Sequence, residues 1–418
     1  MTSFLRLFSR GNSEMSRTRY AWLLVAVLWV LACLNYVDRQ VIFSLFPLLE
    51  KGFGLSGAQL GLLSTAFLWV YAFASPFGGY FADRFGRVRV VLASLAVWSL
   101  VTWATGHART YTELVAARAL MGFSEAFYLP AALALIADHH GERTRATATG
   151  LHQSGLYAGI VLGGVAGGWM GQRYGWRMPF TVLGVMGVAY AAVLVCALRR
   201  ASQEAVSGSR LKMAASLRTV SSLGGFWRLT AAFSAVGLVN WLVYTWLPLY
   251  LYERFRLTLA SAGFSATFYI QAASFVGILA GGVLGDAFAV RRPRGRIWVQ
   301  AAGLAAAAPC LFLVGAVHSF ALLILALVVY GLGRGIYDSN TMPVLCHIAP
   351  DELRSTGYGV FNFMACVVGG VAAALAGFLR SSLGLGVAFQ IAALLLIAAA
   401  WLLLTVSSKL PGATEGSH

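Results

Sequence analysis

The sequence contains few charged residues for its length. They make up 11% of its 418 residues, whereas a soluble globular protein contains about 25%. Hydrophobic residues make up 59% of the chain, and they recur in runs of about 20–30 residues, each long enough to cross a hydrocarbon core about 30 Å thick. A transmembrane β-barrel would instead show short segments of alternating hydrophobicity. We therefore predict an all-α membrane protein that crosses the bilayer many times.

Cysteines and catalytic motifs are scarce as well. The five cysteines all fall within hydrophobic runs, without the spacing of a metal site or of a disulfide framework. No H-E-x-x-H, G-x-S-x-G or P-loop motif occurs, which argues against a membrane enzyme and against a pump driven by ATP. We expect no enzymatic activity, no cofactor and no metal site.

Acidic residues are also rare, with 15 against 31 basic residues and a formal net charge of +16. In a soluble protein this excess would suggest nucleic-acid binding, but here the charges lie between hydrophobic runs, so we expect no nucleic-acid partner. If the segments between successive hydrophobic runs lie on alternate sides of the membrane, 21 basic residues lie on the side of the N-terminus and 7 lie on the opposite side. Because basic residues concentrate in cytoplasmic loops, we expect both termini in the cytoplasm of a bacterial inner-membrane protein. The first run is too long for a cleavable signal peptide.

Hydrophobic runs predict twelve spans in two sets of six. We expect spans at 20–49, 57–81, 89–106, 111–138, 145–170, 177–198, 226–252, 259–288, 296–316, 319–348, 355–379 and 384–407. The polar stretch 199–225 divides the chain into bundles at 1–198 and 226–408, followed by a tail at 409–418. The halves repeat weakly. Phe53-Gly54-Leu55-Ser56 matches Phe255-Arg256-Leu257-Thr258, and aligning Pro130 with Pro343 sets Glu125 against Asp338.

A short motif follows the second span, where the chain reads Gly79-Tyr80-Phe81-Ala82-Asp83-Arg84-Phe85-Gly86-Arg87. It closely resembles the G-x-x-x-D-R-x-G-R signature of the major facilitator superfamily, and a degraded second copy ends at Asp286. The resemblance implies two six-helix bundles related by pseudo-two-fold symmetry and transport by alternating access. It also implies gating roles for a set of charged residues: Asp83, Arg84, Arg87, Asp286, Arg145 and Arg354.

Two further stretches narrow the resemblance. Asn35-Tyr36-Val37-Asp38-Arg39 and Arg118-Ala119-Leu120-Met121-Gly122-Phe123-Ser124-Glu125-Ala126 look like the first and fourth helices of the Spinster family, whose members carry lysolipids and sphingoid phosphates. The anion:cation symporters, which move sugar acids with protons, carry a similar Asp-Arg pair, a similar Arg-to-Glu spacing and a proline that Pro130 matches. The two families stay open as alternatives.

Six ionisable side chains other than histidine fall deep in the predicted spans, where each charge costs about 2.5–3.5 kcal/mol by insertion scales. We assign proton coupling to Asp38 and Glu125, and binding of an anionic group to Arg39 and Arg118, because guanidinium bonds phosphate or carboxylate in a bidentate way. The alternative is that each arginine only neutralises a neighbouring acid. Arg118 and Glu125 are seven residues apart and so share a helix face. Arg334 and Asp338, at i and i+4, read as a structural ion pair.

Amphipathic side chains complete the predicted substrate site: Tyr36, Tyr128, Asn240, Trp241, Tyr244 and Tyr337. The resulting hypothesis is a monomeric, proton-coupled secondary transporter of an amphiphilic anion such as a lysophospholipid or sphingoid phosphate. The alternative is a proton symporter for small organic anions such as sugar acids. Its partners would be that small-molecule or lipid substrate, protons and the membrane lipids.

Overall fold

The chain folds into helices. The structure, a computed structural model, describes residues 17–198, 213–292, 294–350 and 353–406, and these ranges contain no strand. Eleven helices within them are long and apolar enough to cross a membrane. The twelfth expected span is helix α8 (Glu142–Tyr174), which is 33 residues long but rich in glycine and polar residues. The described helices agree with the all-α fold that the sequence predicts.

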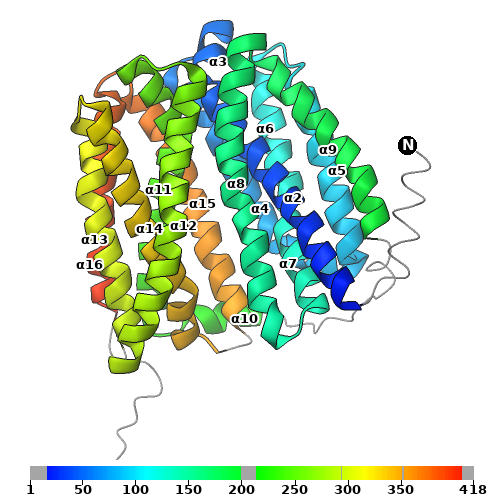
Figure 1. Cartoon of the computed structure of the whole chain (residues 1–418), viewed down its shortest axis with the longest axis vertical. Coiled ribbons are helices and arrows are strands. Elements are labelled where there is room, and N and C mark those ends of the chain that lie inside the picture. Colours follow the sequence, from blue (N-terminus) through cyan, green and yellow to red (C-terminus); the bar gives the residue numbers. More distant parts are fainter. Residues whose placement is uncertain (1–16, 199–212, 293, 351–352, 407–418) are drawn as a thin grey trace, which may run out of the picture. The chain divides into compact units, whose positions relative to one another are not determined.

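Contacts between residues divide the chain into two units. The first comprises Met1–Ser209 with Leu257–Phe264, and the second comprises Arg210–Arg256 with Ser265–His418. The long helices of the first unit are coloured from blue to green in Figure 1. They are α2 (Arg17–Ser44), α3 (Phe46–Phe53), α4 (Gly57–Phe85), α5 (Arg87–Thr105), α6 (Tyr111–Glu125), α7 (Tyr128–His139), α8 and α9 (Arg177–Ala197).

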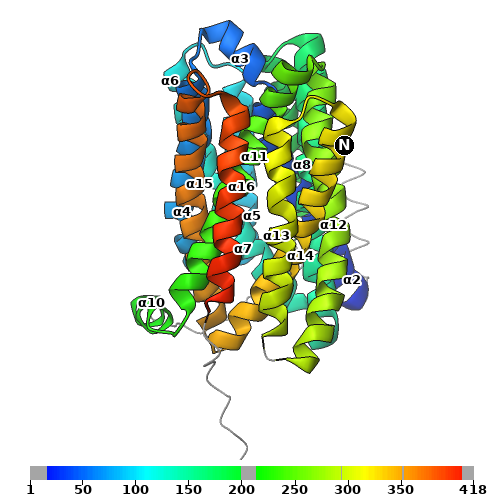
Figure 2. The same cartoon turned by 90° about the vertical axis from the view of Figure 1, so that its left-hand side faces the viewer.

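The second unit repeats the pattern of long helices. They are α11 (Phe226–Phe255), α12 (Leu259–Arg291), α13 (Gly295–Ala316), α14 (Phe320–Ile348), α15 (Arg354–Leu379) and α16 (Gly384–Leu404). The first residues of α12, up to Phe264, group with the first unit. A short helix, α10 (Met213–Ser221), precedes them in the stretch expected to link the halves. Figure 2 shows α10 nearly end-on, so it crosses the direction of α11 and α16. Residues 199–212 and both chain ends lie outside the described ranges, so the cytoplasmic placement of the termini stays a prediction.

Prolines interrupt two spans that the hydrophobic pattern predicts as continuous. The first span breaks at Leu45, because Pro47 has no N–H to bond the carbonyl one turn earlier. The fourth span breaks at Ala126 and Phe127, since Pro130 likewise leaves the Ala126 carbonyl without its helical donor. The fourth expected span nevertheless remains one candidate membrane span, Tyr111–His139. The second break makes Glu125 the last residue of α6.

Helices α2 and α8 lie side by side (Figure 1) and pack through a row of glycines. Gly155, Gly159, Gly163 and Gly167 face the carbonyls of Trp29, Cys33, Val37 and Val41. A Cβ atom added at Gly159 would lie 2.4 Å from the Cys33 carbonyl oxygen, so the backbones can approach this closely only without side chains. The row fixes α2, which carries Asp38 and Arg39, against the body of the first unit.

Candidate functional site

The deepest ion pair of the first unit joins α2 to α6. Nε of Arg39 lies 2.5 Å from Oε2 of Glu125, and these residues are 5% and 0% exposed. The guanidinium also lies over the rings of Tyr36 and Tyr71, at 4.8 and 4.5 Å from their centroids. Helix spacing had placed Glu125 on the same face as Arg118. The structure pairs it instead with Arg39, because α6 ends at Glu125 and the carboxylate meets the neighbouring helix.

Arg118 is buried without an acidic partner. It is 1% exposed, its Nε donates to the Leu63 carbonyl at 3.3 Å, and its Nη1 contacts the Met121 sulfur at 3.1 Å. The ring of Phe67 lies 4.6 Å from the guanidinium carbon. Among the described residues no carboxylate lies within 4.0 Å of it. A buried cation in this state is costly, and the guanidinium can still take an anion.

Asp38 is the second acid of the cluster and also lacks a direct cation. It is 3% exposed, and its Oδ1 accepts no hydrogen bond within the described part of the chain. Its electrostatic neighbours are Glu125 and Arg118, together with the hydroxyl of Thr102 on α5. The four charged residues are therefore one ion pair, Arg39 with Glu125, beside an acid and a base that form no ion pair among the described residues, Asp38 and Arg118.

The other two candidates of the first unit differ in their surroundings. Tyr36 is half-buried and stacks against Arg39. Tyr128 is buried, and its hydroxyl donates to the Leu28 carbonyl at 3.1 Å and lies 2.8 Å from Nε2 of His152. Its hydroxyl is thus already engaged in joining α7 to α2 and α8.

The second unit carries a smaller charged group, surrounded by neutral polar side chains. Nε of Arg334 lies 3.4 Å from Oδ2 of Asp338, one turn along α14. Arg334 also lies over the Tyr244 ring at 5.3 Å, and Trp241 packs edge-on against the same ring at 5.9 Å. Two hydrogen bonds extend the group, and neither donor was predicted from the sequence. Nε2 of Gln271 donates to Tyr244 at 3.2 Å, and the Tyr330 hydroxyl donates to Oδ1 of Asn240 at 3.1 Å.

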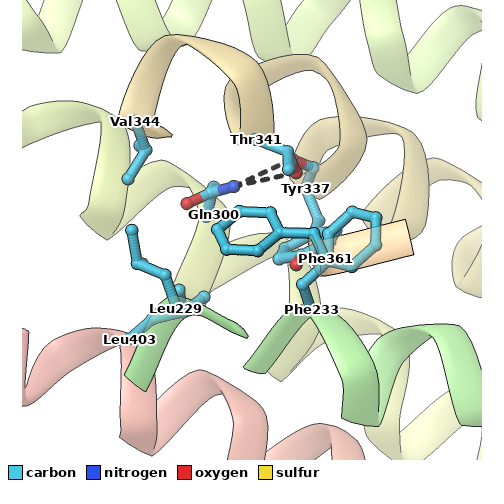
Figure 3. Close-up of a pocket in the computed structure, with 8 residues that line it drawn as sticks. All are labelled: Leu229, Phe233, Gln300, Tyr337, Thr341, Val344, Phe361 and Leu403. Atoms are coloured by element: carbon cyan, nitrogen blue, oxygen red, sulfur yellow. Dashed lines mark hydrogen bonds between the residues drawn. The ribbon is translucent and has the colours of Figure 1, made fainter. Parts of the chain in front are cut away.

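Tyr337 contacts a different set of residues from this polar group. It lines a small cavity with Gln300 and Thr341, and apolar side chains from α11, α14, α15 and α16 form the rest of the wall (Figure 3). Nε2 of Gln300 donates to the Tyr337 carbonyl and to the Thr341 hydroxyl, both at 3.2 Å. The assignment of Tyr337 to substrate stays a prediction.

The expected gating residues engage local partners. Arg87 pairs with Asp138 at the end of α7, a partner that the sequence analysis missed, and Arg296 pairs with Asp286. Nη1 of Arg84 donates to the Tyr80 hydroxyl at 2.8 Å. Arg145 and Arg354 make equivalent bonds, each from Nε to the carbonyl five residues earlier at 3.3 Å. The side chain of Asp83 lies outside the described residues, and the gating roles stay predictions.

Comparison with known proteins decides the family. The model of the Major Facilitator Superfamily matches residues 28–374, with a second match over residues 266–417. The chain belongs to the Major Facilitator Superfamily. Membership makes the protein a multi-pass membrane transporter and not an enzyme. Both families named from the sequence fall within this superfamily, and the twelve-helix architecture fits it.

The chain is similar to curated transporters along most of its length. It is 25% identical over 400 residues to the probable galactarate/D-glucarate transporter GarP of Escherichia coli (strain K12), covering 88% of this chain and 89% of that protein. It is 26% identical over 406 residues to a D-galactonate transporter of Escherichia coli O6:H1, covering 89% and 91%. Among solved structures, an inward-facing, occupied bacterial homologue of the human lysosomal transporter Spinster superposes with a TM-score of 0.78 at 19% identity, covering 92% and 96%. At that identity the likeness shows the fold alone.

Proposed function

We propose that the protein is a proton-coupled secondary transporter of an organic anion, working by alternating access. The observation that carries the proposal is the buried guanidinium of Arg118, which has no carboxylate within ion-pair distance among the described residues. Removing a cation from water costs several kcal/mol unless an anion and hydrogen bonds compensate. A substrate carboxylate or phosphate would supply both, in the bidentate geometry that arginine favours.

Charge balance links the anion to a proton. With all four side chains ionised, Asp38 and Glu125 cancel Arg39 and Arg118. A proton on Asp38 leaves one net positive charge, which an anion with a single negative charge then neutralises. Because uncompensated charge is expensive at this depth, proton and anion bind best together. The proposal therefore expects symport of one proton with each singly charged anion.

The substrate class we favour is a small, hydroxylated organic acid. The relatives similar over most of the chain are named as transporters of galactarate, glucarate and galactonate. A lysophospholipid or sphingoid phosphate, which the sequence analysis ranked first, also carries an anionic head group. The support for such a substrate is only the resemblance to the Spinster family and its fold.

The test is uptake into proteoliposomes under an imposed proton gradient, with galactonate, glucarate and a lysophospholipid as separate substrates. We expect accumulation of a sugar acid that a protonophore abolishes, and loss of that accumulation in Arg118→Gln. Arg173→Gln, which alters an exposed arginine of α8, is the matched control and should transport normally. Accumulation of the lysophospholipid alone would reverse the substrate choice. Full uptake by Arg118→Gln would refute the anion site.

A further inference from the structure

Four buried polar atoms of the first unit lie close together without completing hydrogen bonds. They are Nδ2 of Asn35, Oδ1 of Asp38, Oγ1 of Thr102 and Oε1 of Glu125. Each residue is at most 3% exposed. Thr102 lies beside Asp38, and Asn35 lies beside Glu125. The set contains two groups that can donate and two carboxylate oxygens that accept, so a small adjustment of side-chain geometry would satisfy all four.

The two neutral partners are chemically different. The amide nitrogen of Asn35 can only donate, so it serves the carboxylate form of Glu125, to which Arg39 already binds. The Thr102 hydroxyl can donate to a carboxylate and can equally accept from a protonated carboxyl. Asp38 can therefore gain and lose a proton without losing its neighbour, whereas a proton on Glu125 would face two groups that offer only hydrogen.

We propose that Thr102 and Asn35 are positioning residues that give the two acids different roles, so that Asp38 exchanges the transported proton while Glu125 stays ionised. The inference rests on the proposed function and sharpens it, because the sequence analysis gave both acids the same role. The charged groups that act on Asp38 are Glu125 and Arg118, both from α6. Both remain when Thr102 is replaced, so a change in Thr102 variants reports the hydroxyl. Arg39 and Tyr36 lie on α2 itself, and the remaining titratable groups of the surrounding helices contact Arg39 or Tyr128: Tyr71, Tyr190 and His152.

The first test compares Thr102→Val, which keeps the shape and removes the hydroxyl, with Thr102→Ser, which keeps the hydroxyl. The hydroxyl can bond both forms of Asp38, but its bond to the charged carboxylate is the stronger one. Its loss should therefore move the midpoint of proton-driven uptake upward by about one pH unit, and serine should restore it. Thr105→Val is the control, because Thr105 is also buried on α5 but donates to the Val101 carbonyl at 2.7 Å. An unchanged midpoint in folded Thr102→Val overturns the proposal.

The second test reads protonation directly and does not need transport. Infrared difference spectra of the purified protein between acidic and neutral pH should show a component of the protonated-carboxyl band that is lost in Asp38→Asn and kept in Glu125→Gln. The reverse pattern overturns the division of roles. If the wild type shows this band but no proton-driven uptake, the proposed function fails and the assignment of the proton to Asp38 survives.

An independent observation in the second unit points to a water site. Oε1 of Gln300 is buried and makes no hydrogen bond with the described residues. Figure 3 shows this oxygen turned away from Tyr337 and Thr341, toward Leu229 and Val344. Flipping the amide would not help, because the oxygen would then face the Tyr337 carbonyl. The adjoining cavity measures about 10 Å³, close to the space that one water needs.

We infer that this cavity binds one ordered water that donates to Gln300. The test is an experimental structure at a resolution that shows other buried waters. We expect density about 3 Å from Oε1 in the wild type and its loss in Gln300→Met, a variant of similar shape without the acceptor. Density for a lipid or detergent chain in the cavity, or a clear void in the wild type, would overturn the inference.

Discussion

The two units hold their charges in different ways. In the first unit the ion pair crosses from α2 to α6, and an acid and a base that form no ion pair among the described residues, Asp38 and Arg118, lie beside it. In the second unit the buried arginine, Arg334, pairs with Asp338 one turn along α14, and Asp338 is partly exposed. The second unit's ion pairs between separate elements use exposed acids, Asp286 and Glu253. A pair on one helix survives any movement between helices, whereas a pair across helices lasts only while those helices keep their places. The first unit is therefore the half whose charges can respond to substrate and to movement.

Equivalent positions show the same contrast. Ser56 caps α4 by accepting from Gln59 N, and Thr258 accepts from Ser261 N at the start of α12. Asp38 precedes Ser56 by 18 residues, and Asn240 precedes Thr258 by 18 residues. The second unit thus carries an uncharged amide of the same shape where the first carries a titratable acid. This difference predicts that proton coupling belongs to the first unit.

Giving each of these two positions the side-chain type of the other should have the largest effect on transport. In Asp38→Asn we expect proton-driven accumulation to vanish while exchange of labelled for unlabelled substrate continues, because the site can no longer take up a proton. In Asn240→Asp the remaining uptake should still depend on the proton gradient, since Asp38 remains. Counterflow and uptake in proteoliposomes measure both. Accumulation by Asp38→Asn would place coupling elsewhere.

Removing the arginine of each buried ion pair should destabilise the protein to different extents in the two units. Arg39→Gln leaves the carboxylate of Glu125 buried and uncompensated, at a cost of about 3–5 kcal/mol. Arg334→Gln should cost less, because Asp338 keeps 27% of its side chain exposed. Thermal unfolding in detergent compares the two variants. Equal losses would contradict the distinction between a pair across helices and a pair on one helix.

Helix packing offers a third comparison. Gly159→Ala would place a methyl group 2.4 Å from a backbone oxygen of α2, and we expect a loss of about 1–3 kcal/mol. Gly369→Ala meets the Trp241 side chain at 2.6 Å, and a side chain yields more easily than backbone, so the loss should be smaller. Gly359→Ala, with nothing within 4 Å, is the control. Thermal shifts in the opposite order would refute this ranking.

The smallest effect should come from the helix caps, where the units are alike. Ser56→Ala and Thr258→Ala each remove a hydroxyl that accepts one backbone N–H, at a cost of about 1 kcal/mol each. The measurement is again the unfolding temperature. A large difference between the two would show that the repeat does not extend to these turns.

Much of the fold was predictable because its signals are local. Long apolar runs require helices in a bilayer, since no water is present to satisfy the backbone. The Asp-Arg motif after the second span indicated the superfamily. The breaks before Pro47 and Pro130 were not predictable in this way. Other prolines also lack the N–H that a helix needs, and yet they lie inside continuous helices: Pro76, Pro248, Pro309 and Pro343.

The sequence by itself determined that six ionisable groups lie deep in the membrane, and that their charges cancel. Only the tertiary structure decided which groups meet. Periodicity places Arg118 and Glu125 on one face, but it does not show that α6 stops at Glu125 or that Arg39 of α2 occupies the space beyond. Nor does it bring Thr102 of α5 beside Asp38. Helix spacing is set by neighbours along the chain, whereas charge pairing depends on which helices pack together.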